Sequence, residues 1–326
     1  MKIDFRKFAQ GLAMRDGLQA LEPAIEKEVI HYEILQSLSR HGLLNSLTFQ
    51  GGTCLRLCYA SERYSEDLDF AAGNQFDLID LDAFTRALRA DLLKAFDVSV
   101  RVKEPKVVQD FSGVGMRRWT VVVDIASERP DIPAQRIKLE VASVPSHTSV
   151  IRQVTMNYSD LPASYGQTLV RCQSLGEIMA DKLISFAATD GYIRHRDLWD
   201  IPWLSMLPQT NKAEVPTLVQ WKHGEYGCDK PLASMLAIGC LRAQREMEGP
   251  LFQEQMRRFL SPETYERTVA DKDYRSVMLQ RVTSAYENVA KVLELEDEVE
   301  RELCRHSTDA LEHSVNGAGL MRGKTI

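Results

Sequence analysis

The chain has 326 residues, of which 44% are hydrophobic and 26% charged, with a formal net charge of −6 at pH 7. These values are ordinary for a globular protein, and the length is sufficient for two domains. The negative charge argues against broad, non-specific coating of nucleic acid, although it permits RNA at a local basic site. No apolar run is long enough to span a membrane and no apolar stretch typical of a secretory signal follows the N-terminus, so we expect a cytoplasmic protein with no membrane contact.

The hydrophobic pattern predicts helices first and strands next. Apolar residues recur at intervals of three and four over residues 16–42, which predicts a pair of helices, and again over residues 80–96. Between them we expect a short helix at 53–60 and a strand at 68–71. Alternating or β-branched residues then predict three further strands, at 98–102, 119–125 and 137–144.

The second half of the chain has a different pattern. Residues 104–115 contain Pro, Gly and Ser and are expected to connect strands, and the sheet is expected to end near Pro145. From about Leu175 the pattern is helical, and the tail from Ser307 is expected to be poorly ordered. We therefore expect a core domain with N-terminal helices over residues 1–145 and a mainly helical domain over residues 146–326.

The strongest chemical signal is the segment QGGTCLRLCYASERYSEDLDF, which runs from Gln50 to Phe70. Gly51 and Gly52 precede the short helix, so a phosphate could approach its first backbone amides without meeting a Cβ atom. Asp67 and Asp69 are two residues apart at a strand, where both side chains point to one face and could share a Mg²⁺ ion with substrate phosphates. A glycine pair is usually a turn and an Asp-x-Asp usually a solvated strand end. Their order and spacing together indicate nucleotide chemistry.

A second segment, residues 174–200, places a cation and two carboxylates on predicted helices. Lys182 lies within an apolar helical stripe, where its ammonium group either reaches the surface or meets a nucleotide triphosphate. Asp197 and Asp200 share a helix face, and in the simplest interpretation they are carboxylates favoured by a helix N-terminus. Arg56 and Arg63 lie within the first segment, beside the glycines and aspartates. They either hold a phosphate or pair with acidic residues at the surface.

Together the two segments resemble the signatures of the AbiEii/AbiGii-type nucleotidyltransferase toxins. GGTCLRL and SERYSEDLDF are similar to GGT-x-L-R and R-x-S-x-D-L-D-F, and the second signature runs from Glu177, Asp181 and Lys182 to Arg196, Asp197 and Asp200. The resemblance covers residues 45–72 and 174–201. It implies an α+β fold, with a polymerase-β-like nucleotidyltransferase core (a small mixed sheet with flanking helices) and a helical C-terminal domain.

The resemblance also implies an activity and its partners. The expected reaction is Mg²⁺-dependent transfer of a nucleoside monophosphate from an NTP to an RNA acceptor, with a tRNA 3′ end as the leading candidate, which blocks translation. An antitoxin encoded nearby is the implied protein partner. The alternatives are nucleotidylation of a protein or of a small molecule such as an antibiotic, and an inactive nucleotide-binding partner module. The intact carboxylates and lysine argue against the inactive module.

The same resemblance assigns roles to individual residues. Asp67 and Asp69 are expected to hold the metal, and Lys182 to neutralise charge on the phosphates, while Asp197 orients Lys182 or the acceptor. A third carboxylate could act as base for the attacking hydroxyl, and we favour Glu140 over Asp124. The expected nucleotide-binding residues are Gly51, Gly52, Thr53, Ser65 and Lys182.

The six cysteines of the chain form no C-x-x-C pair. Cys54 and Cys58 would lie one helical turn apart, but no second nearby ligand pair completes a zinc site. We therefore expect reduced thiols that behave mostly as small buried apolar residues.

Overall fold

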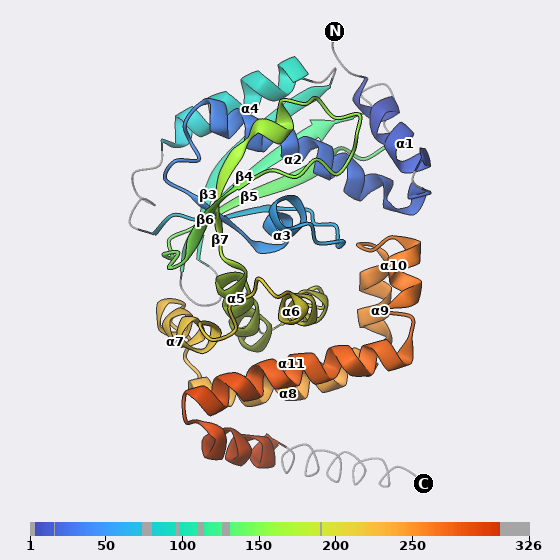
Figure 1. Ribbon diagram of the computed structural model, residues 1–326. Coiled ribbons are helices and arrows are strands. Elements are labelled where there is room, and N and C mark those ends of the chain that lie inside the picture. Colours follow the sequence, from blue (N-terminus) through green and yellow to red (C-terminus); the bar gives the residue numbers. More distant parts are fainter. Residues whose placement is uncertain are drawn as a thin grey trace, which may run out of the picture.

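The computed structural model describes residues 4–15, 17–73, 80–95, 98–109, 114–125, 131–189 and 191–306. The N-terminal half forms a mixed sheet with helices, and the C-terminal half forms a stack of helices beside it (Figure 1). This arrangement confirms the α+β class predicted from the sequence.

The sheet has seven strands in the described part of the chain, in the order β3-β4-β5-β2-β1-β7-β6. Its two parallel pairs are β1 with β7 and β2 with β5, and the other neighbouring pairs are antiparallel. The strands are β1 Thr48–Gln50, β2 Leu68–Ala71, β3 Ser99–Gln109, β4 Gly115–Asp124, β5 Gln135–Ala142, β6 Ser149–Gln153 and β7 Leu169–Gln173.

The helices of the N-terminal half pack on the sheet or connect its strands. The helix α2 Glu22–Arg40 packs against α4 Leu81–Ala95 and the strand β5, and α1 Phe5–Arg15 packs on α2. The predicted pair of helices over residues 16–42 is therefore wrong in part, because one helix runs from Glu22 to Arg40. Pro23 fits in its first turn, where no amide hydrogen is needed. The short helix α3 Gly51–Tyr59 follows β1 without a break and lies between β1 and β2 in the chain.

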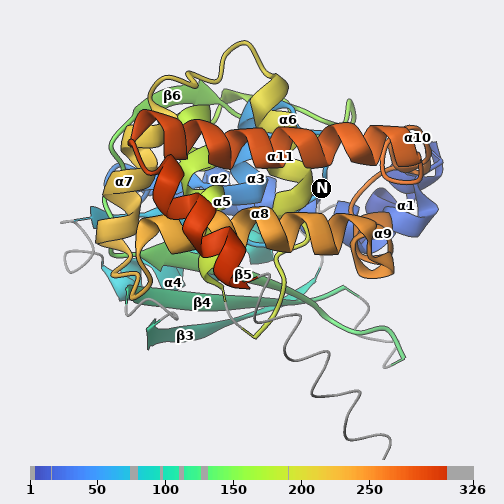
Figure 2. The same ribbon diagram turned by 90° about the horizontal axis from the view of Figure 1, so that it is seen from below.

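The C-terminal half is helical, as predicted. Two long helices, α8 and α11, lie side by side across the molecule, below α5, α6 and α7 (Figures 1 and 2). The amide of Tyr64, just before β2, donates to the carbonyl of Phe259 at 2.8 Å, so this half also contacts the chain beside α3. The helices are α5 Leu175–Ala188, α6 Asp197–Met206, α7 Val215–Glu225, α8 Leu232–Glu248, α9 Pro250–Arg257, α10 Pro262–Arg267 and α11 Lys272–Val292, followed by helical residues 296–306.

Two expectations about the sheet are corrected. The sheet does not end near Pro145, because β6 and β7 extend it and β7 pairs with β1 at Phe49 and Cys172. A domain boundary after β7 fits this topology better than one at residue 145. The strand β3 also continues to Gln109, with a register shift between Lys103 and Lys106 where the sequence predicted a connection. The tail from Ser307 lies outside the described residues.

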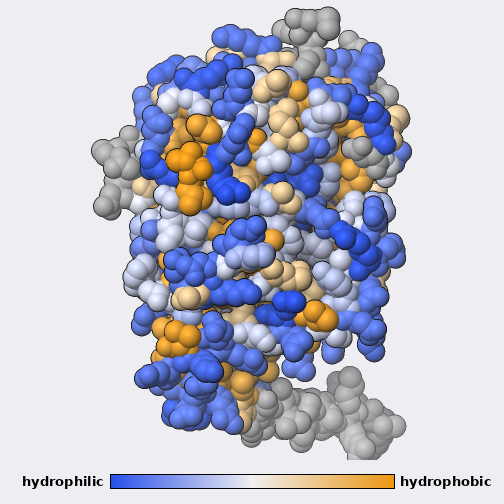
Figure 3. Space-filling view, in the orientation of Figure 1, coloured by the Kyte–Doolittle hydropathy of each residue, from blue (hydrophilic) through white to orange (hydrophobic). Residues whose placement is uncertain are grey.

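None of the helices in the described ranges is both long enough and apolar enough to cross a bilayer. Figure 3 shows one face of the molecule, on which apolar side chains form separate patches among hydrophilic ones.

We expect the stability of the fold to depend on pH through His31 of α2. Its imidazole is fully buried, its Nε2 lies 3.0 Å from the carbonyl oxygen of Glu66, and burial lowers its pKa to about 4. The neutral form is therefore favoured in the folded state, and the stability that it contributes is present above pH 6.5. That stability is lost as the pH falls from 6.5 towards 4, by about 3 kcal/mol in total.

Urea unfolding at several pH values tests this expectation. The variant His31→Gln keeps a hydrogen-bond donor but cannot titrate, so it should flatten the decline between pH 6.5 and 4. The control His223→Gln removes a less buried imidazole that also contacts a backbone carbonyl, that of Lys230. An unchanged decline in His31→Gln would contradict the assignment.

Candidate active site

The turn from β1 into α3 is built around the carboxylate of Asp69. Gln50 is paired with Asp69 across the antiparallel strands, and α3 begins at the next residue, Gly51. Gly51 has a φ of +76°, and a Cβ atom there would lie 2.5 Å from Asp69 Oδ2. Glycine is therefore required at this position both for the backbone conformation and for the close approach of the carboxylate.

The next residues support this turn from inside the protein. A Cβ atom on Gly52 would collide with the guanidinium of Arg63 and lie 2.8 Å from Ser65 Oγ. The buried hydroxyl of Thr53 donates to the carbonyl of Asp67, which holds α3 against the start of β2. The cavity beside Asp69 is lined on this side by Gln50 and Gly51. Direct nucleotide contacts from Gly52, Thr53 and Ser65 stay predictions.

Three carboxylates gather on the neighbouring strands β2 and β5. Asp69 lies directly opposite Glu140 in the parallel register of β2 and β5. Asp67 lies two residues before Asp69 in the chain. Burial, followed by the charges of Glu140 and Asp67, raises the pKa of Asp69 to about 7. Three oxygen donors that repel one another suit a hard cation, because the cation would offset their charge. The donor set therefore fits the metal that the sequence predicted.

The surroundings of these carboxylates differ. Glu140 accepts a 2.6 Å hydrogen bond from Arg118 Nε, and Asp67 accepts one from the backbone amide of Lys138 at 3.2 Å. Asp69 and Glu140 line the cavity, whereas Asp67 is not among the lining residues. The alternative third carboxylate, Asp124, is six residues along β4 from the Arg118 position that pairs with Glu140, a separation of roughly 20 Å. The structure thus places Glu140, and not Asp124, beside Asp69.

Lys182 does not reach the surface. Its side chain is 8% exposed, and its ammonium nitrogen lies 2.9 Å from Asp197 Oδ1 and 2.6 Å from Asp200 Oδ2. The helix α5 carries Lys182 and packs against α6, which supplies both aspartates. Lys182 lines the same cavity as Asp69, so the two segments singled out from the sequence meet at one site.

Two arginines complete this buried charge network. Arg63 donates to both carboxylate oxygens of Asp200, at 2.7 and 2.6 Å, and Arg194 Nε donates to Asp197 Oδ2 at 2.7 Å. Although burial opposes ionisation, Arg194 and Lys182 hold the pKa of Asp197 below its usual value. Arg63 and Lys182 have the same effect on the pKa of Asp200. The ionised form of both carboxylates is therefore favoured, and the formal charges of the three cations and two carboxylates sum to one positive charge beside Asp69 and Glu140.

The site forms a cavity of about 250 Å³ between the sheet and the helices. One of its walls carries Asp181, whose Oδ1 accepts from Tyr226 at 2.8 Å, while its Oδ2 is buried with no hydrogen-bond partner among the described residues. At the opening, the ring of Tyr192 is 60% exposed. The lining residues that carry polar groups are Gln50, Asp69, Arg118, Glu140, Asp181, Lys182, Ser185, Tyr192, Arg194 and Tyr226.

Comparison with known protein families identifies this arrangement. Residues 33–287 match the family described as nucleotidyl transferase AbiEii toxin, type IV toxin–antitoxin system. The match spans well over half of the chain. The chain belongs to the AbiEii nucleotidyltransferase toxin family.

One solved structure shares the fold of this chain, and a second is less similar. MenT4, a nucleotidyltransferase toxin from Mycobacterium tuberculosis H37Rv, is 18% identical with a TM-score of 0.54, and the alignment covers 92% of this chain and 98% of MenT4. JHP933 from Helicobacter pylori is 19% identical with a TM-score of 0.42, over 89% of this chain and 97% of JHP933. Among curated proteins, no significant match is found.

The structure also places several side chains whose positions the sequence alone did not reveal. Arg63 was expected at a phosphate or at the surface, and it is instead buried against Asp200. Arg56 likewise pairs with the buried Glu28, at 2.9 Å. Arg194 and Tyr192 had no predicted role, although both lie close in sequence to the R-D-x-x-D signature. This closeness to the signature is the sequence signal from which both residues could have been found.

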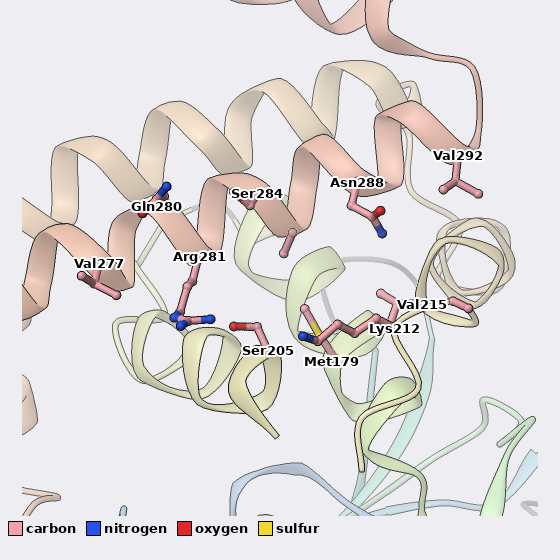
Figure 4. Close-up of a pocket in the computed structure, with 12 residues that line it drawn as sticks. Met179, Ser205, Lys212, Val215, Val277, Gln280, Arg281, Ser284, Asn288 and Val292 are labelled. Atoms are coloured by element: carbon pink, nitrogen blue, oxygen red, sulfur yellow. The ribbon is translucent and has the colours of Figure 1, made fainter. Parts of the chain in front are cut away.

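A larger cavity of about 740 Å³ lies elsewhere, between α11 and the helices α5 to α7 (Figure 4). Its lining includes Lys212 and Arg281, but none of the described residues that line it is acidic. It therefore offers no carboxylate ligand for a metal, and the smaller cavity beside Asp69 is the candidate active site.

We expect the pair between Arg63 and Asp200 to be a major contributor to stability. Replacing Arg63 by Met leaves the Asp200 carboxylate buried with Lys182 as its remaining partner. This should lower the free energy of unfolding by about 3–5 kcal/mol, measured by urea denaturation. The matched control is Arg267→Met, which breaks an exposed pair with Glu62 and should cost less than about 1 kcal/mol. Equal losses in the two variants would show that burial adds nothing to the first pair.

Proposed function

We propose that this toxin transfers a nucleoside monophosphate from an NTP to the 3′ end of a tRNA and thereby blocks translation. The observation that carries the proposal is the single cavity that contains Asp69, Glu140, Lys182 and Arg194. Membership of the family supplies the reaction class, which is nucleotidyl transfer, and implies a nucleotide substrate and an antitoxin.

Asp69, with Asp67 and Glu140 beside it, would hold the Mg²⁺ ion. When bound, such an ion neutralises negative charge on the triphosphate. Lys182 and Arg194 supply fixed positive charge on the other side of the cavity, where negative charge develops during the transfer. Asp197 and Asp200 keep the Lys182 ammonium in place, so no reorganisation is needed when the substrate reacts.

The opening of the cavity supports a nucleic-acid acceptor. Tyr192 is an exposed aromatic ring, and its hydroxyl accepts a hydrogen bond from Arg194 Nη1 at 3.4 Å. An exposed ring beside a guanidinium group is the combination on which single-stranded RNA bases stack. A tRNA 3′ end is single-stranded, so its terminal bases could stack there while the terminal hydroxyl enters the cavity.

Incubation with each α-³²P-labelled NTP tests the acceptor. One reaction contains total tRNA with intact 3′ ends, and the matched reaction contains the same tRNA after periodate oxidation of its terminal ribose. We expect label on intact tRNA, loss of that label with oxidised tRNA or with EDTA, and its return with added Mg²⁺. Label found on protein or on a small molecule from a cell extract, and absent from tRNA, would refute the proposal.

We expect the cavity carboxylates to be required for transfer. Asp69→Asn and Glu140→Gln keep the side-chain volume but remove the charge, and each should lower kcat/KM by on the order of 10² or more. Asp69→Asn should not destabilise the fold at pH 8, since it relieves repulsion among buried carboxylates. The control Asp124→Asn removes the carboxylate on β4 and should retain activity. Full activity in Asp69→Asn would remove Asp69 from the site.

Lys182→Met tests the cation in the same assay. It keeps most of the apolar stem, and we expect a loss in kcat/KM on the order of 10² or more, because one preorganised positive charge is gone. The control Lys212→Met changes a lysine of the larger cavity and should be neutral. Both variants are assayed well below their unfolding temperatures, so that a loss of stability is not mistaken for a loss of chemistry. Normal turnover in Lys182→Met would limit Lys182 to a structural role.

A further inference from the structure

Three cysteine thiols meet behind the glycine turn of the active site. Cys54 and Cys58 lie one turn apart on α3, and Cys172 lies on β7, which pairs with β1. Their sulfur atoms all lie within 4.8 Å of one another, and each residue is at most 2% exposed. The spacing in the sequence did not predict this group, because its third member is far away along the chain.

The distances suit a metal ion held by sulfur. Metal–thiolate bonds are about 2.3 Å long, so three sulfur atoms around one ion would lie about 4 Å apart. The observed group therefore needs little rearrangement to bind. No imidazole, carboxylate or fourth thiol among the described residues joins the group. Structural zinc sites take four ligands, whereas Cu(I) is a soft ion that is satisfied by two or three thiolates.

The charge around the thiols also favours binding of a monovalent ion. Arg152 Nε donates to the carbonyl of Cys58 at 2.9 Å, and its guanidinium lies 4.4 Å from the ring centre of Tyr59. Two thiolates and one Cu(I) carry a net charge of −1, which the positive charge of Arg152 would offset.

We propose that Cys54, Cys58 and Cys172 form a buried site for a soft metal ion, with Cu(I) preferred over Zn²⁺. Binding forms sulfur–copper bonds and releases one proton for each thiol that ionises, without any change of oxidation state. An ion held there would link α3 to β7. The helix that begins at Gly51 would then be fixed at its far end as well.

The test uses the full-length protein, reduced and kept under nitrogen. Cu(I) is supplied as its coloured bicinchoninate complex, both to folded protein and during refolding from urea, because the thiols are sealed from solvent. We expect about one Cu(I) per chain and an unfolding temperature that rises with loading, since the ion binds the folded state. X-ray absorption of the loaded wild type should show sulfur ligands alone.

Variants distinguish the cluster from the other cysteines. The double variant Cys58→Ala/Cys172→Ala, which leaves one thiol of the cluster, should lose the bound Cu(I), whereas Cys240→Ala, which removes a partly buried thiol of α8, should retain it. Circular dichroism checks that each variant is folded, and the X-ray absorption of the wild type decides the ligand type if a cluster variant does not fold. Absence of binding under both loading conditions would overturn the proposal. So would nitrogen or oxygen ligands, retention of Cu(I) by the folded double variant, or a preference for Zn²⁺ at equal concentrations.

Discussion

The burial of the Lys182 ammonium is the constraint on which the active site depends. A charged amine inside a protein is unfavourable unless carboxylates surround it, and here Asp197 and Asp200 do so. Asp200 is in turn paired with Arg63, which comes from the segment that leads into β2. The network thereby connects the helical half to the sheet, and it does so at the cavity where Asp69 lies. Removing any member would disturb both the interface and the chemistry.

The sequence was sufficient for the parts of the site that are local. The pattern of glycines, short helix and alternating carboxylates predicted α3 and β2, which carry Gly51 and Asp69, but it did not predict the strand β1 that precedes them. Lys182 and Asp197 were also placed together, because two neighbouring helices carry them. The distances now show their pairing, while their catalytic roles stay predictions.

The parts that the sequence did not predict arise from contacts between distant segments. The strand β6 is exposed along its whole length, so its residues lack the apolar alternation by which strands are recognised. The strand β7 is short and pairs in parallel with β1, and no local pattern specifies such a partner. The same reason applies to Arg63 and Asp200. Neither segment carries a local signal that these two side chains pair with each other.

The parallel pairing of β1 with β7 has a consequence for the synthesis of the chain on the ribosome. The carboxylate of Asp69 is synthesised early, but β7, Lys182 and Asp200 follow roughly 100 to 130 residues later, which takes on the order of 10 s at usual elongation rates. During that interval the nascent chain contains Asp69 but lacks Lys182 of the same cavity. It also lacks β7, the parallel neighbour of β1. Under the proposed function, the nascent chain would therefore gain transfer activity only once its helical half has emerged.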